Sequence, residues 1–529
     1  MTTTAPTATR AANASRWLRS NRGRFGLAAF FGFVLIYSLF AMETDDFFIT
    51  IIRGLAVGAI TFLVVSGLSL ILGLMDVLNL AHGELYMLGA YVGWMIYVRP
   101  DTFLDLVTPI ALALSGMALL PLWRRIASQW PSGKWLRIIV PVVAMVVGLV
   151  IIVFLFSKFP LSIWNPDVFT EAPTNDAVAL DAGTQVVPEH AGFEGISPLL
   201  GLIGMWLGGA VLGFGIAAAV ERKAEVAAPK PERSAFVISG AVALLAVVVL
   251  AVNNPLTEWW YGLGTTPRFF AAMLLTTVLA FGLGTFIEVV FIRPLYERLL
   301  YQIMMTLGLG FILLEAVRSV WGRPQFTMPK PAAFNGRGDG CPGEGFGDLF
   351  SGCGTIKLFG SRVRMYNEVF IILVGVVVLV VITLILKKSR LGMTIRAGVQ
   401  DSEMVEALGI NVRRVFTITF GLGVALAALG GVVAGPALGL STGMGASVLL
   451  LALIAMAIGG LTSFPGAAAG AVIVGVMQQL MIRFGSVGIP IPGLAEPFKP
   501  SPALVPVSVI LLMVVVLLVL PNGLFGREE

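Results

Sequence analysis

The amino-acid sequence predicts an all-α fold, a polytopic bundle of transmembrane helices. Of its 529 residues, 57% are hydrophobic and 12% are charged, whereas soluble domains average about 45–50% apolar and about 25% charged residues. Apolar runs recur that are long enough to cross about 30 Å of hydrocarbon. The cations gather in short segments between these runs, where they report orientation in a membrane. Despite the net charge of +5, this placement gives no reason to expect a nucleic-acid partner.

About fourteen apolar segments are expected to form helices. They are roughly 25–42, 50–73, 84–98, 104–121, 138–156, 199–220, 234–253, 271–291, 303–321, 367–386, 415–435, 446–460, 466–482 and 503–520. The basic stretch before the first segment favours a cytoplasmic N-terminus, and strict alternation then keeps the later basic loops and the C-terminus inside. The first segment is longer than the core of a signal peptide, so we expect it to be retained.

The first unusual feature is a run without Lys or Arg, residues 54–98, which is too long for one crossing of about 20 residues. The polar residues near its centre are Asp76, Asn79, His82, Gly83 and Glu84. They indicate a broken helix that lines a transport route. The alternative is a short polar hairpin, capped by Asp76 or Asn79 and turned at Gly83. For His82 the alternative to a substrate contact is a neutral, hydrogen-bonded structural histidine.

A second interruption separates the short apolar segments 446–460 and 466–482. Its residues are Gly459, Gly460, Thr462, Ser463 and Pro465. Paired Gly/Pro interruptions in the two halves of a transporter point to its central site, and they favour a possible inverted repeat. The alternative is a tight helix–helix turn. Between the two interruptions, small residues recur every fourth position from Gly423 to Gly435, which predicts close helix packing.

The predicted outside loop 322–366 is rich in Gly and Pro and contains both cysteines, Cys341 and Cys353. A disulfide is possible there if this face lies outside the cytoplasm, and the alternative is two unpaired thiols. Two histidines, His82 and His190, leave little material for a metal site or a histidine-based catalytic centre. We therefore expect no metal and no cofactor. The chain also lacks a phosphate-binding loop, so it is not expected to hydrolyse ATP itself.

One predicted inside loop, 387–414, is longer and more charged than a simple connection requires. Its candidate functional residues are Arg396, Asp401, Glu403, Glu406, Ala407, Leu408 and Gly409. Asp401 can cap a short amphipathic helix, and Gly409 stands where a left-handed C-terminal residue is favoured. Such a helix suits docking into a groove on a soluble partner. The alternative is a helix that lies on the membrane surface.

Taken together, these motifs resemble the permease subunits of branched-chain amino-acid ABC importers. The stretch 79–91 looks like the Asn-Phe-Ala-His-Gly-Glu signature of that family. Residues 459–467 are similar to its Gly-Gly-x-Gly-Ser-x-Pro-Gly-Ala pattern, with Thr462 at a position that is typically Gly. Further similarities lie at 293–295, 306–308, 389–410 and 521–527, and the resemblance spans about 50–98 and 268–527.

The resemblance implies a permease of the bacterial cytoplasmic (inner) membrane that works by alternating access. It also implies a second permease subunit, two cytoplasmic ATPase subunits and an extracytoplasmic solute-binding protein as partners. The residues of both interruptions would line the translocation pathway, and those of 396–414 would couple it to the ATPases. Alternatives are a urea or short-amide permease, or an ion-coupled secondary transporter that uses Asp76, His82 or Glu84.

The expected organisation has four parts. Residues 1–24 form a cytoplasmic basic N-terminus, and 25–98 hold the first helix and the first permease half. Residues 99–267 are longer than the family usually has there, and they contain extra transmembrane segments and an acidic outside loop. Residues 268–529 form the remaining permease core with the coupling loop. Because the insertion adds an even number of segments, it preserves the orientation of the later segments.

Overall fold

The computed structural model of the chain describes residues 22–129, 135–159, 195–221 and 233–526, with short gaps. The gaps are 297, 326, 338–340, 346, 349–350, 359, 391, 395–396, 398–403, 406–408, 410, 462 and 491–495. Most of the predicted acidic loop, and nearly half of the predicted coupling loop 387–414, therefore lie outside the described residues.

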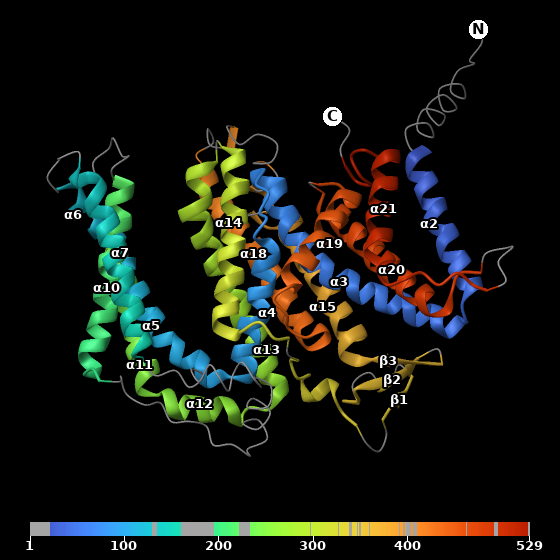
Figure 1. Cartoon of the computed structure of the whole chain (residues 1–529), viewed down its shortest axis with the longest axis horizontal. Coiled ribbons are helices and arrows are strands. Elements are labelled where there is room, and N and C mark those ends of the chain that lie inside the picture. The colour runs from blue at the N-terminus through green and yellow to red at the C-terminus, as the bar shows by residue number, and fades with distance from the viewer. Residues whose placement is uncertain are drawn as a thin grey trace, which may run out of the picture. The chain divides into compact units, whose positions relative to one another are not determined.

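Helices account for most of the described chain (Figure 1). They are α2 (Arg22–Ala41), α3 (Thr44–Met75), α4 (His82–Val98), α5 (Pro100–Ala118), α6 (Leu120–Ser128), α7 (Leu136–Ser157), α10 (Pro198–Glu221), α11 (Arg233–Ala251), α12 (Asn253–Gly262), α13 (Thr265–Ile287), η1 (Glu288–Ile292), η2 (Arg293–Leu295), α14 (Leu299–Trp321), η3 (Ala332–Phe334), η5 (Met365–Phe370), α15 (Ile371–Lys388), α18 (Val412–Leu438), α19 (Met444–Gly459), α20 (Phe464–Val487) and α21 (Leu504–Val519). Each predicted apolar segment coincides with one of these helices. Among the described residues, 10 helices are long and apolar enough to cross a membrane, and three shorter apolar helices accompany them. The predicted all-α, polytopic fold is confirmed.

The contacts divide the chain into two units, Met1–Trp94 with Thr265–Glu529, and Met95–Gly264. In the second unit, α5 packs against α10 and α11, and α7 packs against α10. Its buried core includes Leu112, Met205 and Ala246. This unit also contains an ion pair and a hydrogen bond at Asp101. Arg99 Nη2 lies 2.9 Å from Asp101 Oδ2, and the hydroxyl of Tyr261 donates to Asp101 Oδ1 at 3.0 Å.

The first unit is built around α3, which packs against α15, α18, α19 and α20 (Figure 1). Glycines make this close packing possible, as the four-residue spacing predicts. A Cβ at Gly67 would collide with the backbone of Gly423 in α18, and one at Gly431 would collide with the carbonyl oxygen of Tyr86 in α4. Helix α18 is therefore held against both α3 and α4 at van der Waals distance.

The expected Gly/Pro-rich loop contains a small sheet, which the sequence analysis did not anticipate. Strands β1 (Gly343–Glu344), β2 (Thr355–Leu358) and β3 (Ser361–Arg364) pair in that order, β1 parallel to β2 and β2 antiparallel to β3. Ile356 opposite Val363 forms part of a hydrophobic cluster with Ile49 near the start of α3. The alternating apolar side chains of β2 and β3 explain why this stretch forms strands.

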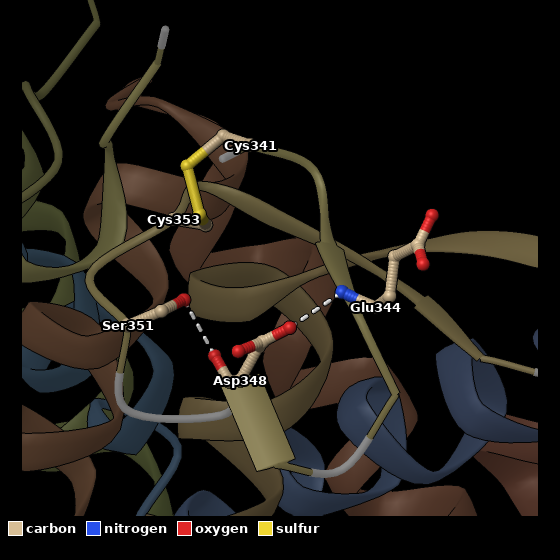
Figure 2. The surroundings of a disulfide bond; sticks show 5 residues. All are labelled: Cys341, Glu344, Asp348, Ser351 and Cys353. Atoms are coloured by element: carbon tan, nitrogen blue, oxygen red, sulfur yellow. Dashed lines mark hydrogen bonds between the residues drawn. A yellow bond between two sulfur atoms is a disulfide. The ribbon is translucent and has the colours of Figure 1, made fainter. Parts of the chain in front are cut away.

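The two cysteines of this loop, Cys341 and Cys353, form a disulfide with a Cα–Cα distance of 5.5 Å (Figure 2). Inside the closed loop, Asp348 Oδ2 accepts the backbone N–H of Glu344 at 2.7 Å, and Ser351 donates to the carbonyl oxygen of Asp348 at 2.7 Å. The loop therefore has its own hydrogen bonds as well as the covalent link.

Candidate functional site

The helix is broken between α3 and α4, where residues 76–81 are not helical. Asp76 ends α3 in the left-handed conformation, at φ 53°, and its N–H bonds to the carbonyl oxygen of Leu72 at 3.0 Å. Asn79 Oδ1 accepts the N–H of Ala81 at 3.1 Å, and its carbonyl oxygen accepts the N–H of His82 at 3.2 Å. The segment is thus a helix break with Asp76 at the end of α3 and Asn79 at the start of α4, as the sequence allowed. That the break lines a transport route stays a prediction.

His82 anchors the start of α4 to α3. The imidazole is fully buried, and its Nε2 lies 3.0 Å from the carbonyl oxygen of Val64. A Cβ on Gly67 would come within 3.0 Å of the same nitrogen. This hydrogen bond agrees with a structural histidine, while Nδ1 has no partner among the described residues. A substrate contact of His82 stays a prediction.

Glu84 lies where the N-termini of two helices meet. Gly83 and Gly445 are in direct contact, so the first turn of α4 packs on the first turn of α19. A Cβ at Gly445 would come within 2.7 Å of Glu84 Oε2. That oxygen is buried and has no hydrogen-bond partner among the described residues. The partial positive charge at a helix N-terminus favours an anion, so both helices stabilise the Glu84 carboxylate.

Helix α14 also packs against the break and the start of α4. The N–H of Leu80 donates to Thr306 Oγ1 at 3.3 Å, and a Cβ at Gly310 would lie 3.6 Å from Glu84 Cγ. Thr306 is fully buried. In the sequence, Thr306 stands out only as part of the stretch 306–308 that resembles the family, and its place at the break could not be predicted. No sequence pattern connects an uncharged threonine with a backbone N–H more than two hundred residues earlier in the chain.

The second interruption is a tight turn between α19 and α20, which was one of its two interpretations. Gly460 has φ 109°, a conformation that glycine adopts readily. Ser463 Oγ accepts the N–H of Gly466 at 3.2 Å and caps α20, and Pro465 stands in the first turn. The backbones of Gly459 and Gly466 touch. Thr462 lies outside the described residues.

The C-terminal segment completes this turn. Leu524 donates its N–H to the carbonyl oxygen of Ile458 at 2.9 Å, and Phe525 donates to that of Gly459 at 3.0 Å. The end of α19 would otherwise have unpaired carbonyl groups. Two motifs that are separate in the sequence, 459–467 and 521–527, therefore form one structural element.

The two interruptions lie at opposite ends of α19. The first contacts Gly445 and the second includes Gly459, so the helix rise of 1.5 Å per residue separates them by about 21 Å. The predicted pathway residues therefore form two groups that cannot share one small ligand. Their joint role at two levels of one pathway stays a prediction.

Most of the predicted coupling residues lie outside the described residues. They are Arg396, Asp401, Glu403, Glu406, Ala407 and Leu408. Gly409 is described, and its φ of 81° is the left-handed conformation that the sequence pattern favours. Two residues later, Asn411 Oδ1 accepts the N–H of Arg414 at 3.1 Å and caps α18.

Among the described residues, no three His, Cys, Asp or Glu side chains are grouped so that they could hold a metal ion. At the predicted outer end of α3, Glu368 is buried and paired with Arg364 at 2.9 Å and Arg53 at 3.4 Å. Near this group, burial lowers the pKa of Lys330, as do Arg364 and Arg337, while Glu368 raises it. The Glu368 carboxylate is therefore paired with two arginines.

The comparisons with known proteins agree on one family. The family described as branched-chain amino acid transport system / permease component matches residues 233–520, just over half of the chain. The high-affinity branched-chain amino acid transport system permease protein LivH of Salmonella typhimurium is 27% identical over 296 residues, which cover 56% of this chain and 84% of LivH. LivH of Escherichia coli K12 gives the same identity and coverage.

The permease protein BraD of Pseudomonas aeruginosa is 27% identical over 299 residues, again covering 56% of this chain and 84% of the relative. No solved structure gives a significant match. The break at 76–81 lies outside the range matched by the family, although the stretch 79–91 that resembles the first signature begins within it. With a polytopic helical fold and a match over more than half of its length, the chain belongs to the family of permease components of branched-chain amino acid transport systems.

Proposed function

We propose that the chain is the membrane-spanning subunit of an ATP-driven importer that moves branched-chain or related amino acids across a bacterial inner membrane by alternating access. The observation that carries the proposal is the polar break between α3 and α4, where Asn79 and His82 are buried and Asp76 is exposed. It is surrounded by α14, α18 and α19, in a member of a family of transport permeases. Non-helical backbone at membrane depth is tolerated where protein buries it or where it lines a water-filled path.

In this proposal, partner subunits that hydrolyse ATP supply the energy for transport. The sequence has no phosphate-binding loop, so two separate ATPase subunits supply hydrolysis. A second permease subunit and an extracytoplasmic solute-binding protein complete the assembly. The 387–414 loop docks onto the ATPases on the cytoplasmic side. It leads directly into α18, and Gly423 of α18 packs on Gly67 of α3, next to the His82 imidazole. A shift of α18 therefore reaches the break through direct contact.

The charge at the break suits a substrate with an ammonium group. The Glu84 carboxylate, whose Oε2 has no hydrogen-bond partner among the described residues, can pair with the ammonium group of an amino acid. Urea and short amides have no such group. Glu84→Gln is therefore expected to reduce amino-acid uptake at least tenfold while leaving membrane insertion intact, because one lost charge-assisted hydrogen bond costs about 1.5–3 kcal/mol. Unchanged amino-acid uptake would show that Glu84 does not pair with the substrate, and uptake of urea in place of amino acids by the unaltered complex would favour the urea or amide alternative.

The proposal is tested by reconstituting the chain with its partners in proteoliposomes. Uptake of leucine, isoleucine or valine is expected to require ATP and the ATPases, and to survive a protonophore. Glu406→Ala and Gly409→Ala are expected to leave the protein inserted but to uncouple hydrolysis from uptake. Uptake that follows an ion gradient without any ATPase would instead establish the secondary-transporter alternative.

A further inference from the structure

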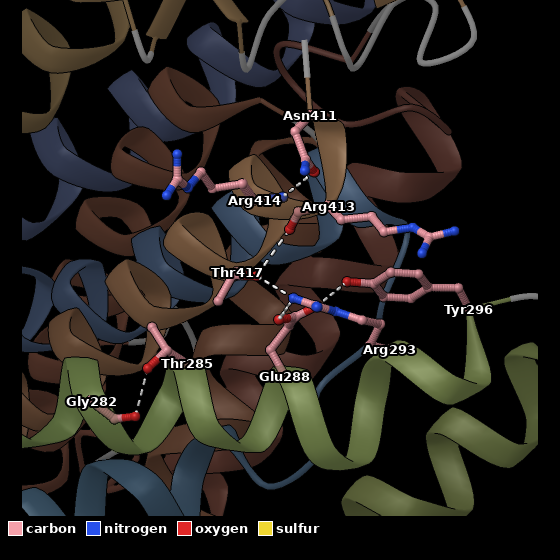
Figure 3. A network of polar contacts seen from close by, with 9 residues as sticks. All are labelled: Gly282, Thr285, Glu288, Arg293, Tyr296, Asn411, Arg413, Arg414 and Thr417. Carbon is pink, nitrogen blue, oxygen red and sulfur yellow. Dashed lines mark hydrogen bonds and ion pairs between the residues drawn. The ribbon is translucent and has the colours of Figure 1, made fainter. Parts of the chain in front are cut away.

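A half-buried ion pair lies at the end of α13 (Figure 3). Glu288, in the π-helix η1, is fully buried. Its carboxylate accepts hydrogen bonds from Arg293 Nε at 3.1 Å and from Nη2 at 2.9 Å. The hydroxyl of Tyr296 donates to the same carboxylate. The planar fork of arginine thus satisfies both oxygens at once, and lysine cannot reproduce this geometry.

The same guanidinium group reaches α18. Arg293 Nη2 donates to Thr417 Oγ1 at 2.6 Å, and the Thr417 hydroxyl donates to the carbonyl oxygen of Arg413 at 2.9 Å. The ring of Tyr296 also packs edge-to-face on Phe416, with centroids 5.6 Å apart. Figure 3 shows Arg293 between Glu288 and Thr417. A hydrogen bond and an aromatic contact therefore connect the first turns of α18 to the segment 288–296.

This cluster stands between the coupling loop and the break. On one side, α18 begins at Val412, directly after the loop. On the other side, η2 leads into α14, whose Thr306 accepts the N–H of Leu80 in the break. Gln302 Nε2 ties the start of α14 back to the carbonyl oxygen of Leu295 at 2.8 Å. Contacts are thus continuous from the loop to the break. A π-turn inside a helix frequently marks a functional position.

We propose that Glu288, Arg293 and Thr417 form a joint that transmits movement of the 387–414 loop to the helices around the break. These are positioning residues, and they set how much transport each ATP hydrolysis yields. The inference rests on the proposed ATP-driven function. Spatial continuity alone does not establish coupling, so the test measures the coupling directly.

The most informative variant is Thr417→Val, because it keeps the shape of the side chain and removes only the hydroxyl. Thr285→Val is the matched control. Thr285 Oγ1 donates to the carbonyl oxygen of Gly282 within α13, at 2.7 Å (Figure 3). Both substitutions remove a hydrogen bond within a helix, but only Thr417→Val also removes the bond to Arg293. Substitution of Glu288 is less informative, because it removes the carboxylate that pairs with both Arg293 and Tyr296 and so threatens folding.

The experiment compares these variants in the full complex, in proteoliposomes, as molecules transported per ATP hydrolysed. Thr417→Val is expected to lower this ratio about 3- to 10-fold while hydrolysis continues, and Thr285→Val is expected to leave it unchanged. Arg293→Lys is expected to lower it as well. Because both variants remove the same bond, the double variant should be no worse than the poorer single one.

The proposed joint would be overturned if Thr417→Val and Thr285→Val transported equally many molecules per ATP hydrolysed. It would also be overturned if the reductions caused by Thr417→Val and Arg293→Lys multiplied in the double variant. Either result leaves the proposed function standing if the unaltered complex still needs ATP. If the unaltered complex transports without its ATPases, the proposed function itself fails. The two failures are therefore distinguishable.

Discussion

Thr306→Val is expected to loosen the break between α3 and α4 without changing the shape of the core. Thr306 Oγ1 accepts the N–H of Leu80 at 3.3 Å and is fully buried. Valine fills the same volume but leaves this N–H without an acceptor. A buried donor that loses its partner costs about 1–3 kcal/mol. Since 1.4 kcal/mol is a factor of ten, local opening of the segment should become about 5- to 150-fold more frequent.

Hydrogen exchange of the peptide that covers 76–84 measures this opening in the purified protein. Thr276→Val is the matched control, because Thr276 is equally buried and its hydroxyl has no hydrogen-bond partner among the described residues. Exchange in that variant should stay at the level of the unaltered protein. The reasoning is refuted if Thr306→Val leaves exchange at 76–84 unchanged, or if Thr276→Val raises it equally.

Three further predictions concern the helix crossings, the second turn and the disulfide. Gly431→Leu inserts a side chain into the contact with α4, so it should destabilise the fold by about 1–3 kcal/mol or more and lower the thermal transition temperature in detergent. Gly282→Leu is the control, because a Cβ there would have no atom within 4 Å, and it should leave the transition temperature unchanged. Ser463→Ala removes the cap of α20, and an unchanged thermal transition would contradict the expected loss of about 0.5–2 kcal/mol. Thiol labelling of Cys341 and Cys353 should require a reductant, and reduction should destabilise the loop by about 3 kcal/mol, detected as faster proteolysis. Labelling without reductant would show that the disulfide is absent.

The helices could be predicted from the sequence because membrane thickness fixes how long an apolar run must be. The apolar runs predict the ends of a helix poorly where polar residues continue it. Helix α3 begins at Thr44, before its apolar run, and includes Asp45 and Asp46 in its first turn. The short helices α6 and α12 and the small sheet were missed as well. Their side chains are too polar, or their strands too short, for a hydropathy pattern to reveal them.

At the candidate site, the sequence indicated which residues are unusual but not which residues meet. Asp76 and Asn79 were correctly expected as possible caps, because their side chains favour turns. The partners Thr306 and Gly445 come from distant helices, and only the packing shows them. In the part of the chain that the structure describes, each of the two π-helices holds a buried glutamate, Glu288 or Glu368, which is paired with an arginine nearby in the chain. No periodicity in the sequence distinguishes such a π-turn from an ordinary helix end.

The central claim is that water reaches the break from alternate sides during ATP-driven transport, and thiol accessibility at Leu80 tests it most directly. The chain has two cysteines, and both are in the disulfide, so Leu80→Cys introduces a single free thiol. In the reconstituted complex, the rate of labelling by a membrane-impermeant thiol reagent should change about tenfold between the nucleotide-free and ATP-trapped states, because the two states expose different faces. An equal rate in both states, from either side of the membrane, would contradict the account.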